Sequence, residues 1–94
     1  MKNYESVVIF YPDVEEEERK KVLDRLSDII NSDGELLEIE EWGDRKFAYE
    51  INYYSNGIYY LFKFKANRDA LTEFDRISKI QDSIIRHMTI NLDK

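Results

Sequence analysis

Two adjacent cations, Arg45 and Lys46, are the residues of this chain best suited to bind an anion. They follow Gly43, a residue typical of a strand bulge or tight bend, and they lead into an aromatic-rich strand. A guanidinium offers a planar fork and an ammonium a point charge, and both suit phosphate. Two such cations can also be surface charges paired with nearby carboxylates, and the residues alone leave both interpretations open.

Other candidate residues lie on predicted strands. Tyr49 can pack its ring as a half-buried strand residue and still present its hydroxyl to RNA. Arg86 and His87 are neighbours, so they point to opposite faces of their strand. The alternation through Arg86 and Met88 is the more apolar one and would normally be the core side, yet that would bury Arg86 near the strand start. The register of this strand stays open.

Metal binding and catalysis find little support in the sequence. The carboxylates of residues 15–18 diverge by about 100° each around a helix, so they indicate a solvated helix start rather than an ion site. A single His excludes a His-rich metal centre, and the absence of Cys excludes disulfide and thiolate chemistry. The acidic loop after the first strand disfavours a phosphate-cleaving enzyme of the acylphosphatase type.

Composition predicts one domain, residues 1–94, that is soluble and cytoplasmic, with no membrane association. A hydrophobic fraction of 43% suffices for one core, and the net charge of −6 argues against sequence-blind nucleic-acid binding. The charge is unevenly spread: residues 1–41 hold 5 Lys/Arg and 13 Asp/Glu, or −8, and residues 42–94 hold 9 and 7, or +2. A local cationic patch is therefore compatible with the acidic total.

The elements that must position these residues follow the order βαββαβ. Apolar and aromatic patterns predict strands over 4–11, 35–54 (interrupted at Gly43), 58–65 and 84–92, and helices over 14–31 and 68–80. Ser55, Asn56 and Gly57 form a strong hairpin signal. This order predicts an α+β, ferredoxin-like fold: a four-stranded antiparallel sheet with two helices on one face, and with the first and third strands in the centre.

At this point the chain resembles a known family, ribosomal protein six of the bacterial small subunit, over essentially all its residues. The most specific stretch is residues 41–51, which resembles the family signature of a glycine, a basic pair, a Leu-Ala-Tyr-like triplet and an isoleucine. The aromatic strand that begins at Gly57 and the strand segment over residues 82–88 match further parts of the family pattern, as does Tyr4-Glu5 after the cation Lys2.

The resemblance implies a structural, non-enzymatic ribosomal protein without cofactor or metal. It implies binding to the central domain of small-subunit rRNA, together with ribosomal protein eighteen as a heterodimer. The RNA-binding residues that it implies are Lys2, Tyr4, Arg45, Lys46, Tyr49 and Arg86. Without the resemblance, a ferredoxin-like regulatory or protein-interaction domain would be the leading hypothesis, because such domains share the βαββαβ order.

Overall fold

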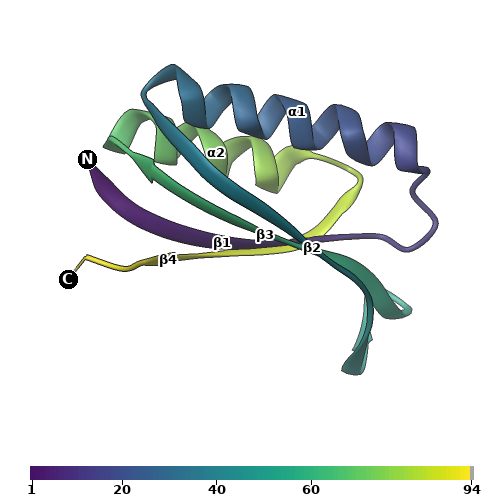
Figure 1. Cartoon of the computed structure of the whole chain (residues 1–94). Helices are drawn as coiled ribbons and strands as arrows, with labels where there is room; N and C mark the ends of the chain where they lie inside the picture. Colours follow the sequence, from purple (N-terminus) through teal and green to yellow (C-terminus); the bar gives the residue numbers. More distant parts are fainter. Residues whose placement is uncertain (94) are drawn as a thin grey trace.

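The structure is a computed structural model that describes residues 1–93. It contains, in chain order, the elements β1 (Lys2–Phe10), α1 (Glu16–Ser32), β2 (Gly34–Ile51), β3 (Tyr54–Ala66), α2 (Arg68–Ile80) and β4 (Ile84–Asn91). The four strands form one sheet in the order β2-β3-β1-β4, with each neighbouring pair antiparallel. Both helices cover the same face of this sheet (Figure 1). The ferredoxin-like prediction is confirmed, including the central position of β1 and β3.

The core lies between the two helices and the sheet. Alternate residues of β3 point toward the helices, so Phe62 and Phe64 are fully buried and contact Phe74 of α2 at ring-centroid distances of 5.5 and 5.3 Å. Leu26 and Ile30 of α1 are also fully buried in this cluster. Among residues 1–93, no helix is long and apolar enough to cross a membrane.

The hairpin between β2 and β3 turns earlier than the sequence predicted. Ile51 pairs with Tyr54, and the two residues between them have positive φ angles, 50° at Asn52 and 69° at Tyr53. Ser55, Asn56 and Gly57 belong instead to β3, so their prediction as the turn is wrong. The local Asn-Gly signal was outweighed by packing, because Gly57 is required for a close approach between chain segments.

Gly57 lies where the hairpin crosses the end of β1. A Cβ at this position would come within 3.0 Å of both the Phe10 carbonyl oxygen and the Phe47 ring, and within 2.7 Å of the Ile9 side chain. Only a residue without a side chain lets the three segments meet at this distance. The role of Gly57 is therefore to allow this close packing, and not to form the hairpin turn.

A β-bulge settles the register of β4. Phe10 lies opposite Ile84 while Ile9 lies opposite Arg86, so Ile85 is the extra residue on β4. Ile84 is buried in the core, but beyond the bulge His87 lies opposite the buried Val8 and faces the helices. The apolar alternation through Arg86 and Met88 therefore faces away from the core, contrary to the side expected from its hydrophobicity.

Candidate nucleic-acid interface

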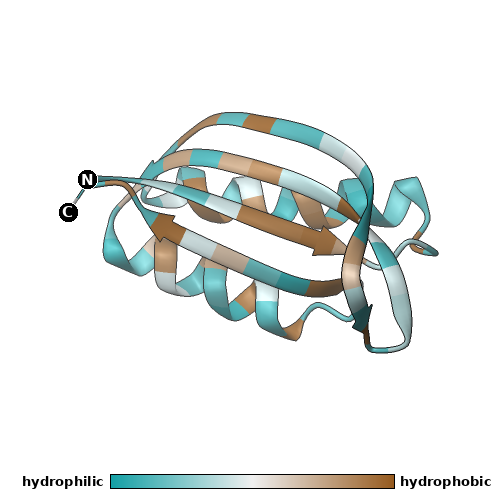
Figure 2. Ribbon diagram, turned by 90° about the horizontal axis from the view of Figure 1, so that it is seen from below, coloured by the Kyte–Doolittle hydropathy of each residue, from teal (hydrophilic) through white to brown (hydrophobic). Residues whose placement is uncertain are grey.

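The face of the sheet without helices carries an apolar surface at its centre. It is formed by the residues of β1, β3 and β4 that alternate with the core residues, among them Ile9, Tyr59, Leu61 and Met88. Figure 2 shows this open face with apolar residues on the neighbouring strands. Ile9 and Leu61 are only 8% and 7% exposed although no helix covers them. Side chains from the long β2–β3 hairpin and its neighbours must therefore shelter this face.

The β2–β3 hairpin bends away from the helical layer. Figure 1 shows it leaving the plane of the sheet on the side opposite to the helices. Gly43 has a φ of 80°, and the pairing with β3 shifts register between Glu41 and Gly43, as the sequence predicted for a bulge. Beyond the bulge, the Phe47 ring lies 6.2 Å from that of Tyr59. The bend thus brings the segment that carries the predicted cations over the end of the open face.

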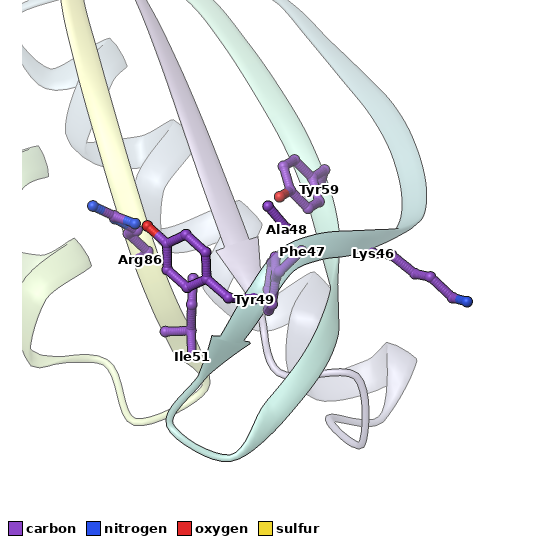
Figure 3. A pocket seen from close by; sticks show the side chains of 7 residues that line it. All are labelled: Lys46, Phe47, Ala48, Tyr49, Ile51, Tyr59 and Arg86. Atoms are coloured by element: carbon purple, nitrogen blue, oxygen red, sulfur yellow. The ribbon is translucent and has the colours of Figure 1, made fainter.

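A small pocket forms where the hairpin approaches β4. Its cavity of about 220 Å³ is lined by Lys46, Phe47, Ala48, Tyr49, Ile51, Tyr59 and Arg86. In Figure 3 the Tyr49 hydroxyl and the Arg86 guanidinium point toward the same space, and Lys46 extends outward from the other side of the hairpin. Tyr49 is 75% exposed, and both cations are exposed. The pocket therefore combines an open aromatic ring with positive charge.

Arg45 is positioned by a tryptophan. Its guanidinium carbon lies 5.3 Å from the centroid of the Trp42 ring, which is within the range of a cation–π contact. The Trp42 indole nitrogen in turn donates a hydrogen bond of 3.1 Å to a carboxylate oxygen of Glu40. This chain of contacts holds the guanidinium over the ring and leaves its edge free to meet a ligand.

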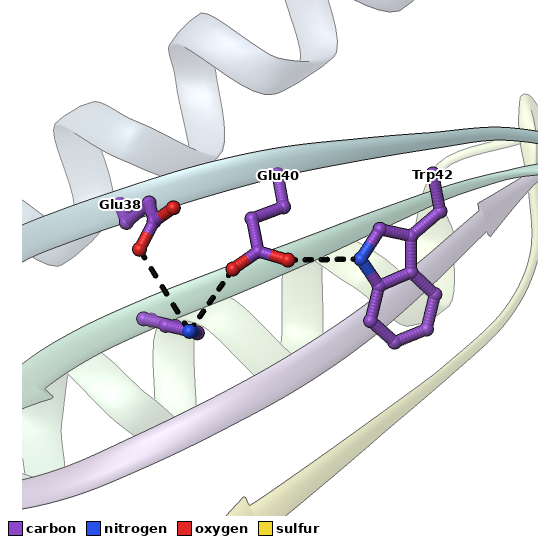
Figure 4. A network of polar contacts seen from close by, with 4 residues as sticks. Glu38, Glu40 and Trp42 are labelled. Atoms are coloured by element: carbon purple, nitrogen blue, oxygen red, sulfur yellow. Dashed lines mark hydrogen bonds and ion pairs between the residues drawn. The ribbon is translucent and has the colours of Figure 1, made fainter.

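Glu40 is fixed from a second side by Lys63 of β3. The Lys63 ammonium lies 3.0 Å from Glu40 and 3.7 Å from Glu38, and Figure 4 shows the network. The hydrogen bond from Trp42, followed by that from Lys63, lowers the pKa of the Glu40 carboxyl. The hydrogen bond to Glu40 likewise raises the pKa of Lys63. The Glu40 carboxylate is thus already occupied.

Asp44, next to the cationic pair, also has a partner of its own. Asp44 accepts a hydrogen bond of 2.7 Å from the Asn56 side chain. Within residues 1–93, no ion pair closer than 4.0 Å involves Arg45 or Lys46. The interpretation of these cations as halves of surface ion pairs is therefore not what the structure shows.

A second groove continues from the first across the open face. Its cavity of about 320 Å³ is lined by Val7, Ile9, Trp42, Tyr59, Arg86, His87 and Met88. Tyr59 and Arg86 border both cavities. The two hollows therefore make one surface that is cationic at the hairpin and apolar toward the middle of the sheet.

The structure brings four of the six predicted RNA-binding residues to one end of the sheet and separates the other two. Arg45, Lys46, Tyr49 and Arg86 lie at the hairpin end. Lys2 opens β1 at the opposite end, roughly 25 Å away along a strand that rises about 3.3 Å per residue. Lys2 is exposed and borders a shallow depression beside Arg68. Tyr4 faces the helices, is 7% exposed and packs against Phe64 at 5.6 Å.

The side chain of His87 belongs to a polar cluster under α2, although the residue also borders the groove on the open face. Its imidazole Nε2 lies 3.3 Å from the Asp75 carboxylate, and its side chain is 13% exposed. The Thr89 hydroxyl is within hydrogen-bond distance of both Asp75 and Ser6. Among residues 1–93, no group of three or more His, Cys, Asp or Glu side chains is arranged to hold a metal ion.

Sequence reasoning missed the positioning contacts of Arg45. From the sequence, Trp42 is interpreted as a strand-end packing residue with an interface role as the alternative, Glu40 as one possible ion-pair partner of the cations, and Lys63 only as a residue of its strand. The only available signal was the alternation of Glu38, Glu40 and Trp42 along one strand, which places them on a common side. Assigning Lys63 to them required the register between β2 and β3, which three irregularities shift.

Comparisons with known proteins agree on one family. The family model described as ribosomal protein S6 matches residues 3–91. A small ribosomal subunit protein bS6 from Alkaliphilus oremlandii is 47% identical over 94 residues, covering all of both chains. The bS6 protein of Lactobacillus helveticus is 44% identical over 93 residues, covering 97% of this chain and 95% of the relative. The crystal structure of 30S ribosomal protein S6 from Thermotoga maritima superimposes with a TM-score of 0.88 at 35% identity, covering 96% of this chain and 86% of that one.

Proposed function

The chain belongs to the ribosomal protein S6 family, and we propose that it is a structural component of the small ribosomal subunit that binds rRNA jointly with another protein. The RNA is the central domain of small-subunit rRNA, and the partner is ribosomal protein eighteen, bound as a heterodimer. The relatives are small ribosomal subunit proteins, which supports the expected location on the cytoplasmic ribosome.

The observation that carries the RNA part of the proposal is the pair of free cations on the bent hairpin. Arg45 and Lys46 are exposed, and neither takes part in an ion pair among residues 1–93. Glu40 is paired with Lys63, and Asp44 accepts a hydrogen bond from Asn56. A phosphate can therefore approach without displacing an existing ion pair. The exposed ring of Tyr49 beside these charges adds a surface on which an unpaired base can stack.

Arg86 extends the proposed RNA surface from the hairpin onto β4, because it lines the same pocket as Lys46 and Tyr49. Lys2 is proposed as a separate phosphate contact at the other end of β1. Tyr4 exposes little surface, so its proposed contribution is chiefly to hold the strand that carries Lys2. RNA that touches both ends must span the length of the sheet.

The apolar groove on the open face is the proposed docking surface for ribosomal protein eighteen. Met88 and Ile90 are 58% and 50% exposed there, next to the sheltered Ile9 and Leu61. A heterodimer would cover these side chains. Since this chain carries a net charge of −6, a basic partner would also supply cationic surface that the chain lacks.

The proposed role is non-catalytic, in line with the family. The family match covers nearly the whole chain, and it favours the ribosomal role over the alternative of a ferredoxin-like regulatory domain.

Gel-shift titrations of the rRNA central domain test the proposal. We expect weak retardation by this chain alone and much stronger retardation after addition of ribosomal protein eighteen. Equal affinity with and without the partner would contradict a shared RNA-binding surface. A pull-down from a bacterial lysate that recovers a metabolic enzyme, and neither small subunits nor a small basic protein, would favour the regulatory alternative.

A further inference from the structure

The tip of the β2–β3 hairpin holds a large aromatic residue in an unfavourable backbone conformation. Asn52 and Tyr53 are the two central residues of the turn, and both have positive φ. A two-residue hairpin loop with this geometry is of the type I′ kind, which strongly prefers Asn followed by Gly. Asn52 fits the first position. A tyrosine with φ of 69° at the second position is an outlier for a bulky side chain.

The residues on either side of Tyr53 form hydrogen bonds with the loop that follows β1. The Asn52 side-chain amide donates a hydrogen bond of 3.1 Å to the Tyr11 hydroxyl. The Tyr54 hydroxyl donates one of 3.0 Å to the Asp13 carboxylate, and the Tyr54 ring packs against Tyr11 at 4.9 Å. These contacts fix the turn on the body of the protein, and none of them involves the Tyr53 side chain.

The Tyr53 side chain itself is 96% exposed. It therefore gains nothing from packing that would offset the strain of its backbone. Strained backbone conformations cluster at ligand-binding sites, where surrounding contacts hold them in place. A ring presented on a fixed turn also loses little freedom when a ligand covers it. Both properties suit a residue that contacts a ligand.

We propose that Tyr53 is an additional RNA-binding residue whose ring stacks on an unpaired base of the small-subunit rRNA. This inference rests on the proposed function. The hairpin that presents the ring also carries Arg45, Lys46 and the exposed Tyr49. Cations that meet the backbone beside aromatic rings that stack on bases are the combination by which proteins bind single-stranded nucleic acid.

RNA suits this tip better than a protein partner. The proposed docking surface for the protein is the apolar groove at the middle of the open face, whereas the tip projects beyond the sheet (Figure 1). Stacking also needs only an open ring face, which an isolated and fully exposed tyrosine supplies. A protein interface would instead surround the ring with further apolar residues.

The substitution Tyr53→Gly separates the effect on folding from the effect on binding. It gives the turn the Asn-Gly sequence that type I′ geometry prefers, so the denaturant midpoint should stay equal or rise. At the same time the heterodimer with ribosomal protein eighteen should bind the rRNA central domain about 5- to 100-fold more weakly. Tyr53→Asn should behave similarly, and Tyr53→Phe should retain wild-type affinity because the ring remains.

The outcomes distinguish this inference from the function on which it rests. If the wild-type heterodimer retards the rRNA and Tyr53→Gly does so equally well, the stacking role is wrong and the proposed function stands. If the wild-type heterodimer fails to bind, both are wrong. Photocrosslinking from benzoylphenylalanine placed at position 53 should give an RNA adduct. An adduct with ribosomal protein eighteen alone would overturn the inference.

Discussion

The positive charge of Arg45 is available to a ligand because no ion pair among residues 1–93 involves it. Glu40 is bound by Lys63 and Trp42, and the face of the indole holds the guanidinium by a cation–π contact. Lys46 extends outward from the pocket in Figure 3. The two adjacent cations therefore differ in their surroundings: Arg45 is held against a ring, and Lys46 extends into solvent.

Replacing both cations with Ala should weaken binding of the heterodimer to rRNA and reduce its salt dependence. If each cation meets a phosphate, the log–log slope should fall by roughly 1–2 units, since each contact releases condensed counterions. Thermal stability should barely change, because exposed charges contribute little to folding. The matched control is the pair Lys20→Ala and Lys21→Ala on α1. A change of slope in that control, without one in the hairpin variant, would place the RNA on the helical side.

Acidification should release Trp42. The folded-state pKa of Glu40 is lowered, so its hydrogen bond to the indole is present above the ordinary carboxyl pKa and is lost as pH falls through the folded value. The chain has one Trp, so its fluorescence reports this step directly. We expect a transition with a midpoint below 4.5, the ordinary value for this carboxyl.

The variant Glu40→Gln should abolish this fluorescence transition, whereas Glu38→Gln should leave it in place. A transition that persists in Glu40→Gln would mean that another carboxyl controls the tryptophan.

Among the elements, local signals predicted the helix α2 well and the hairpin poorly. The predicted bounds of α2 are those of the structure, because its buried stripe of Ala70, Phe74 and Ile77 lies within the helix itself. The hairpin turn was predicted at the wrong residues because Gly57 is needed for contacts with segments that are distant in the sequence. No pattern in a single sequence reveals that the hairpin passes so close to the end of β1.

The functional surface was also predictable only in part, because local patterns are visible in the sequence and long-range pairing is not. Adjacent cations and aromatics are visible in the sequence, so the hairpin stood out as a candidate interface. The place of Arg86 beside it depends on the bulge at Ile85, which reverses the alternation of β4. The apolar alternation of β4 through Arg86 and Met88 favoured the core side, but it faces the open side of the sheet, which is itself apolar. The separation of Lys2 and Tyr4 from the other candidates likewise follows from strand length and pairing.

Gly57→Ala should destabilise the protein by about 1–3 kcal/mol, because the added methyl group must displace the Phe10 carbonyl and the Phe47 ring. Gly43→Ala is the comparison: no atom lies within 4 Å of its added Cβ, and only the positive φ opposes it. That strain costs about 1 kcal/mol. Denaturant midpoints measure both. Equal midpoints for wild type and Gly57→Ala would show that the crossing of hairpin and β1 is loosely packed.

For the molecule as a whole, charge of each sign is concentrated at particular places. The first turn of α1 carries Glu16, Glu17 and Glu18, whereas Arg45 and Arg86 lie on the hairpin and the open face. An RNA backbone is therefore repelled from the first turn of α1 and attracted to the cations of the hairpin.

Truncation of the helical core should lower stability without altering the RNA-binding side chains. Leu26 and Phe74 are fully buried between the helices and the sheet. We expect Leu26→Ala to cost about 2–5 kcal/mol and Phe74→Ala about 3–5 kcal/mol. Urea denaturation measures the loss. Unchanged midpoints would mean that these side chains do not form the core described here.

The pairing of β1 with β4 has a consequence for synthesis. β1 leaves the ribosome first, yet both of its neighbours, β3 and β4, are encoded in the second half of the chain. Until β4 has emerged, a nascent sheet would leave the backbone of β1 unpaired along one side and would lack Ile84 from its core. Native folding must therefore wait until translation is nearly finished. A product released before β4 is synthesised would expose the unpaired backbone groups of β1 to proteases and chaperones. It would not enter a ribosomal particle as a folded part.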